Sequence, residues 1–341
     1  MRPLSVALLL ALTSAGRASE HGRVVRIEKP ASTMVYIPAG TFEMGVSDDM
    51  DQVDLDEAIK LCKQDFPSPG LQQPVAGGMI PRSFCDDYGS ELEHMSRRKI
   101  TLDAFYFDRD EVSTAAYRKC VAGGGCGLEP LIAGDERYVR DDWPMVNITW
   151  TEAQSFCRWS GGSLPTEAQW ERAARGDDRR PWPWGDAPRD HDFNHGQASS
   201  IAMRDIDQRQ LLLYIDYVGD PDGSDGFPLI APPGRYTWGA SPYGARDMAG
   251  NVAEWTLDLW ALDDTKRGYD NLEPKLARWE SIGHINPVRE GPANEPHVVR
   301  GGSWRQPAWL GRTNLRDPYN IVYSGDHRFS HIGFRCARPA N

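Results

Sequence analysis

The chain has 341 residues, a hydrophobic fraction of 40%, and a formal net charge of -11 that comes from 49 acidic and 38 basic side chains. This length allows one large domain or two ordinary ones, and the hydrophobic fraction is that of a soluble globular protein. The net negative charge argues against sequence-independent binding to nucleic acid or to an anionic membrane, because both require a basic surface.

Residues 1–19 are predicted to be a secretory signal peptide. Arg2 precedes an apolar run from Leu4 to Leu12, and small residues follow near the expected cleavage site. Such a run is too short to cross a bilayer as a stable helix. No later stretch is long and apolar enough to span a membrane, so we expect a secreted or periplasmic protein. Residues 20–33 are predicted to be a linker.

Residues 34–341 are predicted to form one loop-rich domain. The segment "MVYIPAGTFEMG", residues 34–45, alternates apolar and polar residues around the turn "PAG", which predicts a β-hairpin. A further strand is expected at the start of residues 99–113. The 25 Pro, 33 Gly and 12 Trp favour irregular structure around an aromatic core. Residues 47–98, acidic at their start, are predicted to be an insertion.

Two capping boxes predict two short helices. Thr149 is followed three residues later by Glu152 and then by apolar residues at helical spacing. Thr166 with Gln169 repeats this arrangement before a helix that should end at Gly176. Each helix should bury one aromatic face.

An even number of cysteines in an exported chain favours disulfides over metal ligation. The six are Cys62, Cys85, Cys120, Cys126, Cys157 and Cys336. Cys120 and Cys126 flank the flexible segment "VAGGG", which would let their sulfurs meet. A disulfide between Cys62 and Cys85 would hold the insertion in shape. No two cysteines are separated by only two residues, so neither a zinc ribbon nor a thioredoxin-type site is expected.

Six segments in order carry a family resemblance: "IPAGTFEMG", "ITLDAFYFDRDEVS", "PMVNITWTEAQSFCRWSGGSLPTEAQWERAARG", "YGARDMAGNVAEWTLDLW", "VVRGGSW" and "HIGFRCAR". Together they resemble the formylglycine-generating enzyme family, also called the sulfatase-modifying factor family. The resemblance implies an α+β domain with little regular secondary structure, related to C-type-lectin-like folds. It also implies a disulfide between Cys157 and Cys336, whose long loop would make it worth about 4–5 kcal/mol in the chain-entropy model.

The resemblance further implies two structural calcium sites built from oxygen ligands, which Ca²⁺ requires. One site would use Asp247 and Glu254 with the backbone carbonyls of Gly250 and Val252. The other would use Asn194 and Asp225 with the carbonyls of His195 and Phe227. The alternative is that these acids cap turns or accept hydrogen bonds from arginines.

Family members that generate formylglycine bind Cu(I) through two cysteines, five residues apart, just after the Gly-Gly-Ser turn. A gap-free alignment places Gln306 and Gly311 at these positions. A carboxamide is a weak, hard ligand and glycine has no side chain, whereas Cu(I) prefers soft thiolates. We therefore expect no copper and no formylglycine-generating activity on this scaffold.

The segment after this turn is rich in aromatic and basic residues, which suit recognition of a peptide or a glycan. The predicted ligand-binding residues are Ser303, Trp304, Arg305, Gln306, Trp309, Arg312 and Arg316. Core packing of the tryptophans and ion pairing of the arginines are the alternatives. The favoured hypothesis is binding of a peptide, glycan, protein or envelope ligand in the family cleft. Two others remain: an oxidoreductase without a copper-thiolate centre, and a partner subunit of an active family member.

Two histidine pairs and one serine suggest other chemistry. His191 with His195, and His327 with His331, are four residues apart, a spacing that on a helix places two metal ligands on one face. Both pairs lie in predicted loops, so surface or capping histidines are favoured. Ser303 lacks the context of a nucleophile elbow, so a serine hydrolase is not favoured.

Overall fold

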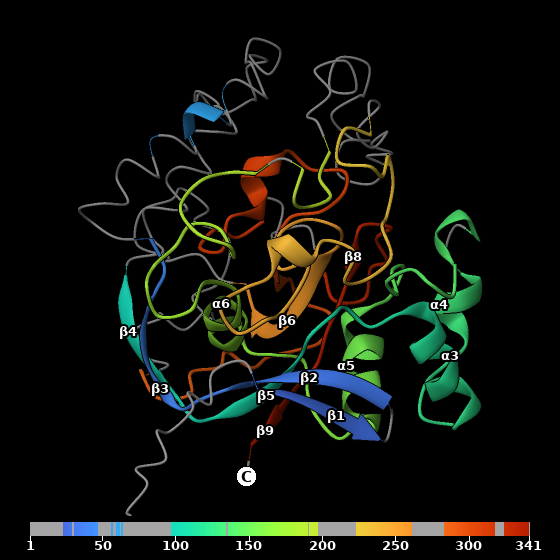
Figure 1. Ribbon diagram of the computed structural model, residues 1–341. Coiled ribbons are helices and arrows are strands. Elements are labelled where there is room, and N and C mark those ends of the chain that lie inside the picture. Colours follow the sequence, from blue (N-terminus) through green and yellow to red (C-terminus); the bar gives the residue numbers. More distant parts are fainter. Residues whose placement is uncertain are drawn as a thin grey trace, which may run out of the picture.

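Helices and strands are few and short, and loops carry most of the chain (Figure 1). The computed structural model describes residues 23–28, 31–46, 56, 59–61, 63, 97–133, 136–189, 191–196, 223–260, 283–317 and 324–340. Within these ranges no helix combines the length and the apolar character that a membrane span requires. The predicted α+β class with little regular secondary structure is confirmed.

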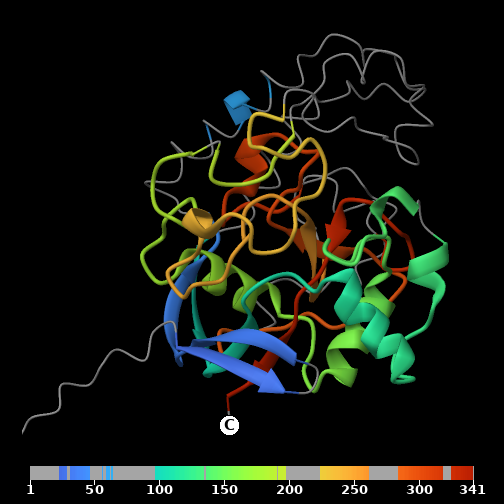
Figure 2. The same ribbon diagram turned by 45° about the vertical axis from the view of Figure 1, so that its right-hand side comes forward.

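Four strands form the largest sheet of the described chain, in the order β1-β2-β5-β9. They are β1 (Val24–Glu28), β2 (Ala31–Ile37), β5 (Phe105–Asp108) and β9 (Ala337–Pro339), and every neighbouring pair is antiparallel. Strand β1 lies among the residues predicted to be a linker, so the sheet begins before residue 34. Figures 1 and 2 both show this sheet at one end of the molecule, with the C-terminus beside it.

The segment predicted to be a hairpin forms two strands, but the predicted pairing between them is wrong. Strand β2 pairs with β1 and β5, whereas β3 (Gly40–Met44) pairs with β4 (Arg98–Leu102) in a separate sheet. The guanidinium of Arg172 occupies the corner, where Nη1 donates to the carbonyls of Pro38 at 2.9 Å and Gly40 at 3.3 Å. Alternation identified the strands, but it does not specify a strand's partner.

A third sheet contains strands from three of the family segments. Strand β6 (Ala253–Leu259) lies between β7 (His297–Arg300), to which it is antiparallel, and β8 (Ile332–Gly333), to which it is parallel. All seven residues of β6 except Leu257 are buried. This sheet therefore fixes the start of the glycine turn that follows Arg300.

Both predicted capping boxes are present. Helix α5 (Trp150–Trp159) begins after Thr149, which exchanges hydrogen bonds with Glu152, and α6 (Glu167–Arg175) begins after Thr166, which does the same with Gln169. Gly176 ends α6 with φ of 73°, a conformation that glycine adopts without a Cβ clash.

Two further helices and three 3₁₀ turns complete the described elements. These are α3 (Thr114–Ala122), α4 (Glu129–Ile132), η1 (Glu136–Tyr138), η2 (Thr237–Gly239) and η4 (Ala308–Gly311). Figures 1 and 2 show α3 and α4 on the side of the molecule opposite β3 and β4.

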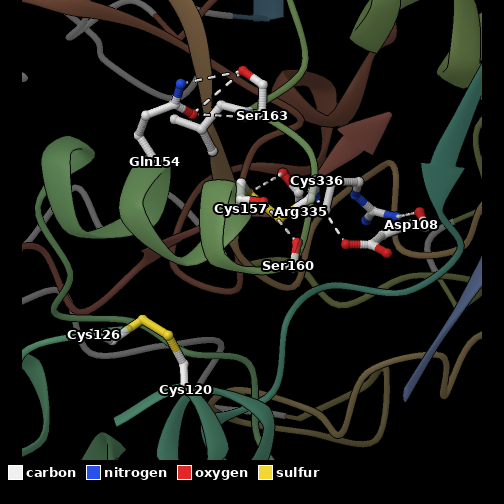
Figure 3. Close-up of a disulfide and its surroundings, with 10 residues drawn as sticks. Asp108, Cys120, Cys126, Gln154, Cys157, Ser160, Ser163, Arg335 and Cys336 are labelled. Atoms are coloured by element: carbon white, nitrogen blue, oxygen red, sulfur yellow. Dashed lines mark hydrogen bonds between the residues drawn. A yellow bond between two sulfur atoms is a disulfide. The ribbon is translucent and has the colours of Figure 1, made fainter. Parts of the chain in front are cut away.

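Two predicted disulfides are confirmed. Cys157 of α5 is bonded to Cys336, which directly precedes β9, across a sequence separation of 179 residues (Figure 3). Cys120 is bonded to Cys126 across 6 residues. The predicted Cys62–Cys85 bond lies outside the described residues.

The core consists of separate apolar clusters rich in aromatic rings. One cluster joins Phe42, Phe107 and Trp170, and thus strands of both N-terminal sheets with α6. Another joins Phe156 of α5 and Trp255 of β6 with the Cys157–Cys336 disulfide. The predicted aromatic core is therefore present. It packs α6 against the two N-terminal sheets and α5 against the sheet that supports the glycine turn.

Candidate functional site

The glycine turn that follows β7 requires glycine at both positions. Gly301 and Gly302 have φ of 96° and 67°. A Cβ on Gly301 would lie 3.1 Å from Trp170 Cζ2, and a Cβ on Gly302 would lie 2.9 Å from the Leu310 carbonyl carbon. The turn thus packs directly on α6 and on η4, and it sets the course of residues 303–317.

Gln306 lies at the first family-cysteine position, and the protein uses both ends of its carboxamide. Ser303 Oγ donates to Gln306 Oε1 at 2.8 Å, and Gln306 Nε2 donates to Asp317 Oδ2. The backbone is also held, because Gly196 N donates to the Gln306 carbonyl at 2.8 Å. The side chain is only 4% exposed. Gln306 is therefore a buried polar link between two parts of the loop.

Gly311 lies at the second family-cysteine position, and there is little room for a side chain. A Cβ built on Gly311 would lie 3.2 Å from Ala249 Cβ, 3.2 Å from Phe193 Cε2 and 3.4 Å from Trp182 Cζ3. Trp182, Phe193 and Ala249 belong to one buried cluster. Aromatic packing thus crowds the place from which a second thiolate would project.

Most side chains predicted to face a ligand are buried. Trp304 is 1% exposed and stacks on Tyr138 with ring centres 5.8 Å apart, and Trp309 is 5% exposed. Arg312 is also buried, with its guanidinium 6.0 Å from the centre of the Trp182 ring. Core packing, the alternative reading of the tryptophans, accounts for their place in the described fold.

Of the seven predicted ligand-binding residues, Arg305 alone is partly exposed. A binding role for the other six stays a prediction. Because they are buried, they would contribute by setting the shape of the loop and not by contacting the ligand through an exposed aromatic face.

A buried ion network lies beneath the turn. Arg300 contacts Glu167 at 3.1 Å and Glu171 at 2.7 Å, and Arg316 holds both carboxylate oxygens of Glu167 at 2.6 Å. Burial acts to raise the pKa of Glu167, but Arg316 and Arg300 hold it below its ordinary value. The salt-bridge alternative considered for Arg316 is therefore what the structure shows. The network clamps both ends of residues 300–316 to α6.

The four residues of the Asn194 calcium prediction are brought together. Both carboxylate oxygens of Asp225 accept backbone N–H bonds, from His195 at 2.9 Å and from Phe227 at 2.8 Å. Asn194 Nδ2 donates to the Leu229 carbonyl at 2.7 Å, while its Oδ1 is buried with no hydrogen-bond partner among the described residues. An amide oxygen without a hydrogen bond, a carboxylate and backbone carbonyls are the kinds of oxygen ligand that Ca²⁺ takes.

The two acids of the other predicted calcium site, Asp247 and Glu254, accept hydrogen bonds from different groups. Glu254 receives Arg335 Nη2 at 2.6 Å on Oε1 and Trp170 Nε1 at 2.8 Å on Oε2. Asp247 accepts a hydrogen bond from Gly234 N. Burial raises the pKa of Asp247 to about 6.

Gly250 and Val252, the predicted carbonyl ligands, lie on the turn between Asp247 and Glu254, with Gly250 at φ of 73°. The hydrogen-bond alternative for these acids is thus realised at Glu254.

Two residues of this region escaped the sequence prediction. Burial and the nearby Asp247 raise the pKa of Glu111 well above its ordinary value, and its Oε1 accepts Asn251 Nδ2 at 2.9 Å. Arg335 is fully buried and supplies the cation of the region. Both lie inside recognised family segments, "DRDEVS" and "HIGFRCAR", yet their hydrogen-bond partners Asn251 and Glu254 lie 140 and 81 residues away and leave no local signal.

The histidine pairs lie in loops, as predicted. His191 Nδ1 is 3.1 Å from the Ser224 carbonyl, and His195 packs on Phe193 with ring centres 4.8 Å apart. His327 is exposed, and His331 is buried. The described part of the chain holds no group of three or more His, Cys, Asp or Glu arranged to hold a metal ion.

Comparison with known proteins adds the family. Residues 21–340 match the family described as "Sulfatase-modifying factor enzyme 1-like domain". The chain is 25% identical over 352 residues to a bovine (Bos taurus) formylglycine-generating enzyme, covering 90% of this chain and 75% of that protein. It is 27% identical over 298 residues to a hercynine oxygenase of Mycolicibacterium smegmatis, covering 84% of this chain and 58% of that protein.

Among solved structures, PvdO from Pseudomonas aeruginosa aligns with a TM-score of 0.56 at 22% identity, over 94% of this chain and 100% of that one. This likeness shows a shared fold.

Proposed function

The chain belongs to the sulfatase-modifying factor family, and we propose that it binds a peptide, glycan or envelope ligand in the family cleft without generating formylglycine. The single observation that carries this proposal is the chemistry at Gln306 and Gly311. An amide whose two ends are already hydrogen-bonded and a glycine packed against aromatic rings stand where a soft ligand pair is needed.

The rest of the described chain supplies no substitute for that ligand pair. All four described cysteines are engaged in disulfides. A sulfur in a disulfide is not a thiolate and cannot serve as the nucleophile or metal ligand that a free thiol provides. The glycine turn and the buried ion network beneath it nevertheless hold residues 300–316 in a defined course.

We expect the purified protein to leave the cysteine of a sulfatase-type peptide unchanged when it is incubated with copper, oxygen and a thiol reductant. Mass spectrometry of the peptide checks this, with an active formylglycine-generating enzyme as the positive control. Recovery of the unmodified peptide on immobilised protein would support binding. Conversion of the peptide cysteine to an aldehyde would contradict the proposal.

A second candidate function is oxidation of a small molecule or peptide by a mechanism without copper thiolates. The similarity to a hercynine oxygenase favours it. Oxygen uptake by protein that retains a stoichiometric redox metal would support this candidate. A partner subunit of an active family member would instead raise that enzyme's activity on mixing.

Calcium forms part of the proposal, with Asn194, Asp225 and the carbonyls of His195 and Phe227 as ligands of the better supported site. The orphaned Asn194 Oδ1 is the supporting observation. A bound ion stabilises the folded state by RT ln(1 + [L]/Kd), about 2.7 kcal/mol at a hundredfold excess over Kd.

We expect millimolar calcium to raise the melting temperature and a chelator to lower it, and Asn194→Ala to abolish most of this difference. Thermal unfolding with and without calcium measures it. Asp141→Asn is the control, because its carboxylate is exposed and pairs with Arg118 at the surface. A melting temperature that changes with neither calcium nor chelator would overturn the calcium proposal.

Export is also part of the proposal. The two disulfides are consistent with a secreted or lumenal protein, because such bonds persist in oxidising compartments. N-terminal sequencing of the exported protein would identify the cleavage site predicted after residue 19, and a retained Met1 would contradict it.

A further inference from the structure

A cavity whose lining includes neither Gln306 nor Gly311 is present in the described chain. Its volume is about 280 Å³, and residues 191–192, 225–227 and 235–238 line it. Pockets that hold drug-sized ligands measure about 300–1,000 Å³, so this one suits a smaller group such as a single ring. None of the predicted ligand-binding residues of the glycine-turn segment lines this cavity.

Three aromatic rings line the cavity, and one is unusually exposed. Trp238 on η2 is 80% exposed, the most exposed of the large hydrophobic side chains in the described chain. Phe227 and Tyr236 meet edge to face with ring centres 6.3 Å apart. The exposed indole beside a concave surface offers a flat apolar face that suits a flat ligand.

The acids of the cavity are already engaged. Both oxygens of Asp225 accept backbone N–H groups, and Asp192 pairs with Arg189 at 3.3 Å. Tyr236 Oη donates to the Asp225 carbonyl at 3.0 Å, which fixes this wall. The carboxylates of this cavity are thus already hydrogen-bonded or ion-paired within the chain.

The available charge is positive. Arg235 is exposed, and its guanidinium lies 5.9 Å from the centre of the Phe227 ring. It forms no ion pair with any carboxylate of the described chain. His191 and Thr237, both exposed, add polar groups around the same cavity. An exposed guanidinium beside aromatic rings can bind a carboxylate through two N–H donors.

We propose that this cavity binds one sugar ring that carries a carboxylate, such as a uronic acid residue of a glycan. The C–H face of the ring packs on the Trp238 indole, and the carboxylate pairs with the Arg235 guanidinium. The sugar hydroxyls exchange hydrogen bonds with His191 and Thr237. This binding uses none of the residues at the family-cysteine positions, so it holds or fails independently of whether the protein generates formylglycine.

The net charge of -11 shapes the choice of ligand. A long polyanion would be repelled by the rest of the surface, whereas one carboxylate needs only the local guanidinium. A neutral sugar would keep the stacking contact and lose the charged one. The acidic sugar should therefore bind more tightly than its neutral counterpart, and the difference should fall as salt rises.

The test uses the full secreted chain and two small probes, methyl β-glucuronide and methyl β-glucoside, titrated by NMR or calorimetry. We expect the glucuronide to bind at least about fivefold more tightly than the glucoside. Trp238→Ala should weaken binding of the glucuronide by about tenfold or more. Arg235→Gln should reduce affinity for the glucuronide to the level of the glucoside. Ile132→Ala, which shortens an exposed apolar side chain on α4, is the control and should change nothing.

Three outcomes would overturn the proposal. They are no saturable binding of either sugar, equal affinity for the two sugars, and unchanged affinity in Trp238→Ala. Circular dichroism of each variant confirms that it is folded, and the mutated side chains are exposed, so loss of binding is not loss of structure.

Discussion

Replacing Arg335 with methionine is expected to lower the free energy of unfolding by about 3–5 kcal/mol, because it leaves a buried carboxylate without its cation. Arg335 is fully buried, and Glu254 is 1% exposed. Arg335 Nε lies 2.9 Å and 2.8 Å from the two oxygens of Glu254, and Nη2 lies 2.6 Å from Oε1. Burial alone would lower the pKa of Arg335, but Glu254 holds it above its ordinary value.

The guanidinium of Arg335 also donates hydrogen bonds to backbone carbonyls, and the methionine variant would lose these bonds. Arg335 donates to the carbonyls of Asp108 at 3.1 Å, Arg109 at 3.0 Å and Arg246 at 2.9 Å. Figure 3 shows it beside Cys336 and Asp108, at the point where the disulfide meets the first sheet. Each buried acceptor left without a donor costs about 1–3 kcal/mol, so the loss reaches beyond the ion pair.

Chemical denaturation with a linear extrapolation measures the change. Arg118→Met is the matched control, since Arg118 pairs with Asp141 at 2.7 Å on the surface and its loss should cost about 1 kcal/mol or less. Adding Glu254→Gln to Arg335→Met should restore part of the stability, because the unpaired charge is then removed. A loss in Arg335→Met no larger than in the control would show that the pair does not hold these elements together.

Local signals in the sequence predicted local structure well. The capping boxes at Thr149 and Thr166 are present because each depends on residues three positions apart. The Cys157–Cys336 bond was predicted from the family resemblance, which carries long-range information that spacing lacks.

The sequence did not predict strand pairings or ion pairs between residues that are far apart in the chain. Strands β2 and β3 are neighbours in sequence and part at a corner held by Arg172, which comes from a helix more than a hundred residues away. The same limit applies to the site. Arg316 has the composition of a ligand-binding residue, but its partner Glu167 lies far along the chain, and only the fold reveals the pair.

The sequence also did not predict which side chains are buried. Helix α6 buries four charged residues, Glu167, Glu171, Arg172 and Arg175, where its pattern would place them in water. The aromatic residues after the glycine turn suggested a binding face, and the structure shows that Trp304 and Trp309 are buried. The exposed Trp238, in contrast, has no motif that marks it, and only its exposure and its place in a cavity single it out.

The protein is expected not to bind Cu(I) tightly. A pair of thiolates binds this soft ion tightly, whereas a carboxamide and a glycine do not. The variant Gln306→Cys/Gly311→Cys provides a gain-of-binding control because it returns both sulfurs. The cysteine at 311 would crowd Phe193 and Ala249, so this variant should also lose about 1–3 kcal/mol of stability from overpacking.

A competition titration of Cu(I) against a chromophoric chelator under anaerobic conditions tests whether the site at Gln306 and Gly311 binds copper. A Cys62→Ser/Cys85→Ser background keeps those two sulfurs from contributing. We predict that the protein leaves all of the copper with the chelator, while the double-cysteine variant withdraws some of it. Withdrawal of one equivalent of Cu(I) by the chain with Gln306 and Gly311 in place would contradict the account.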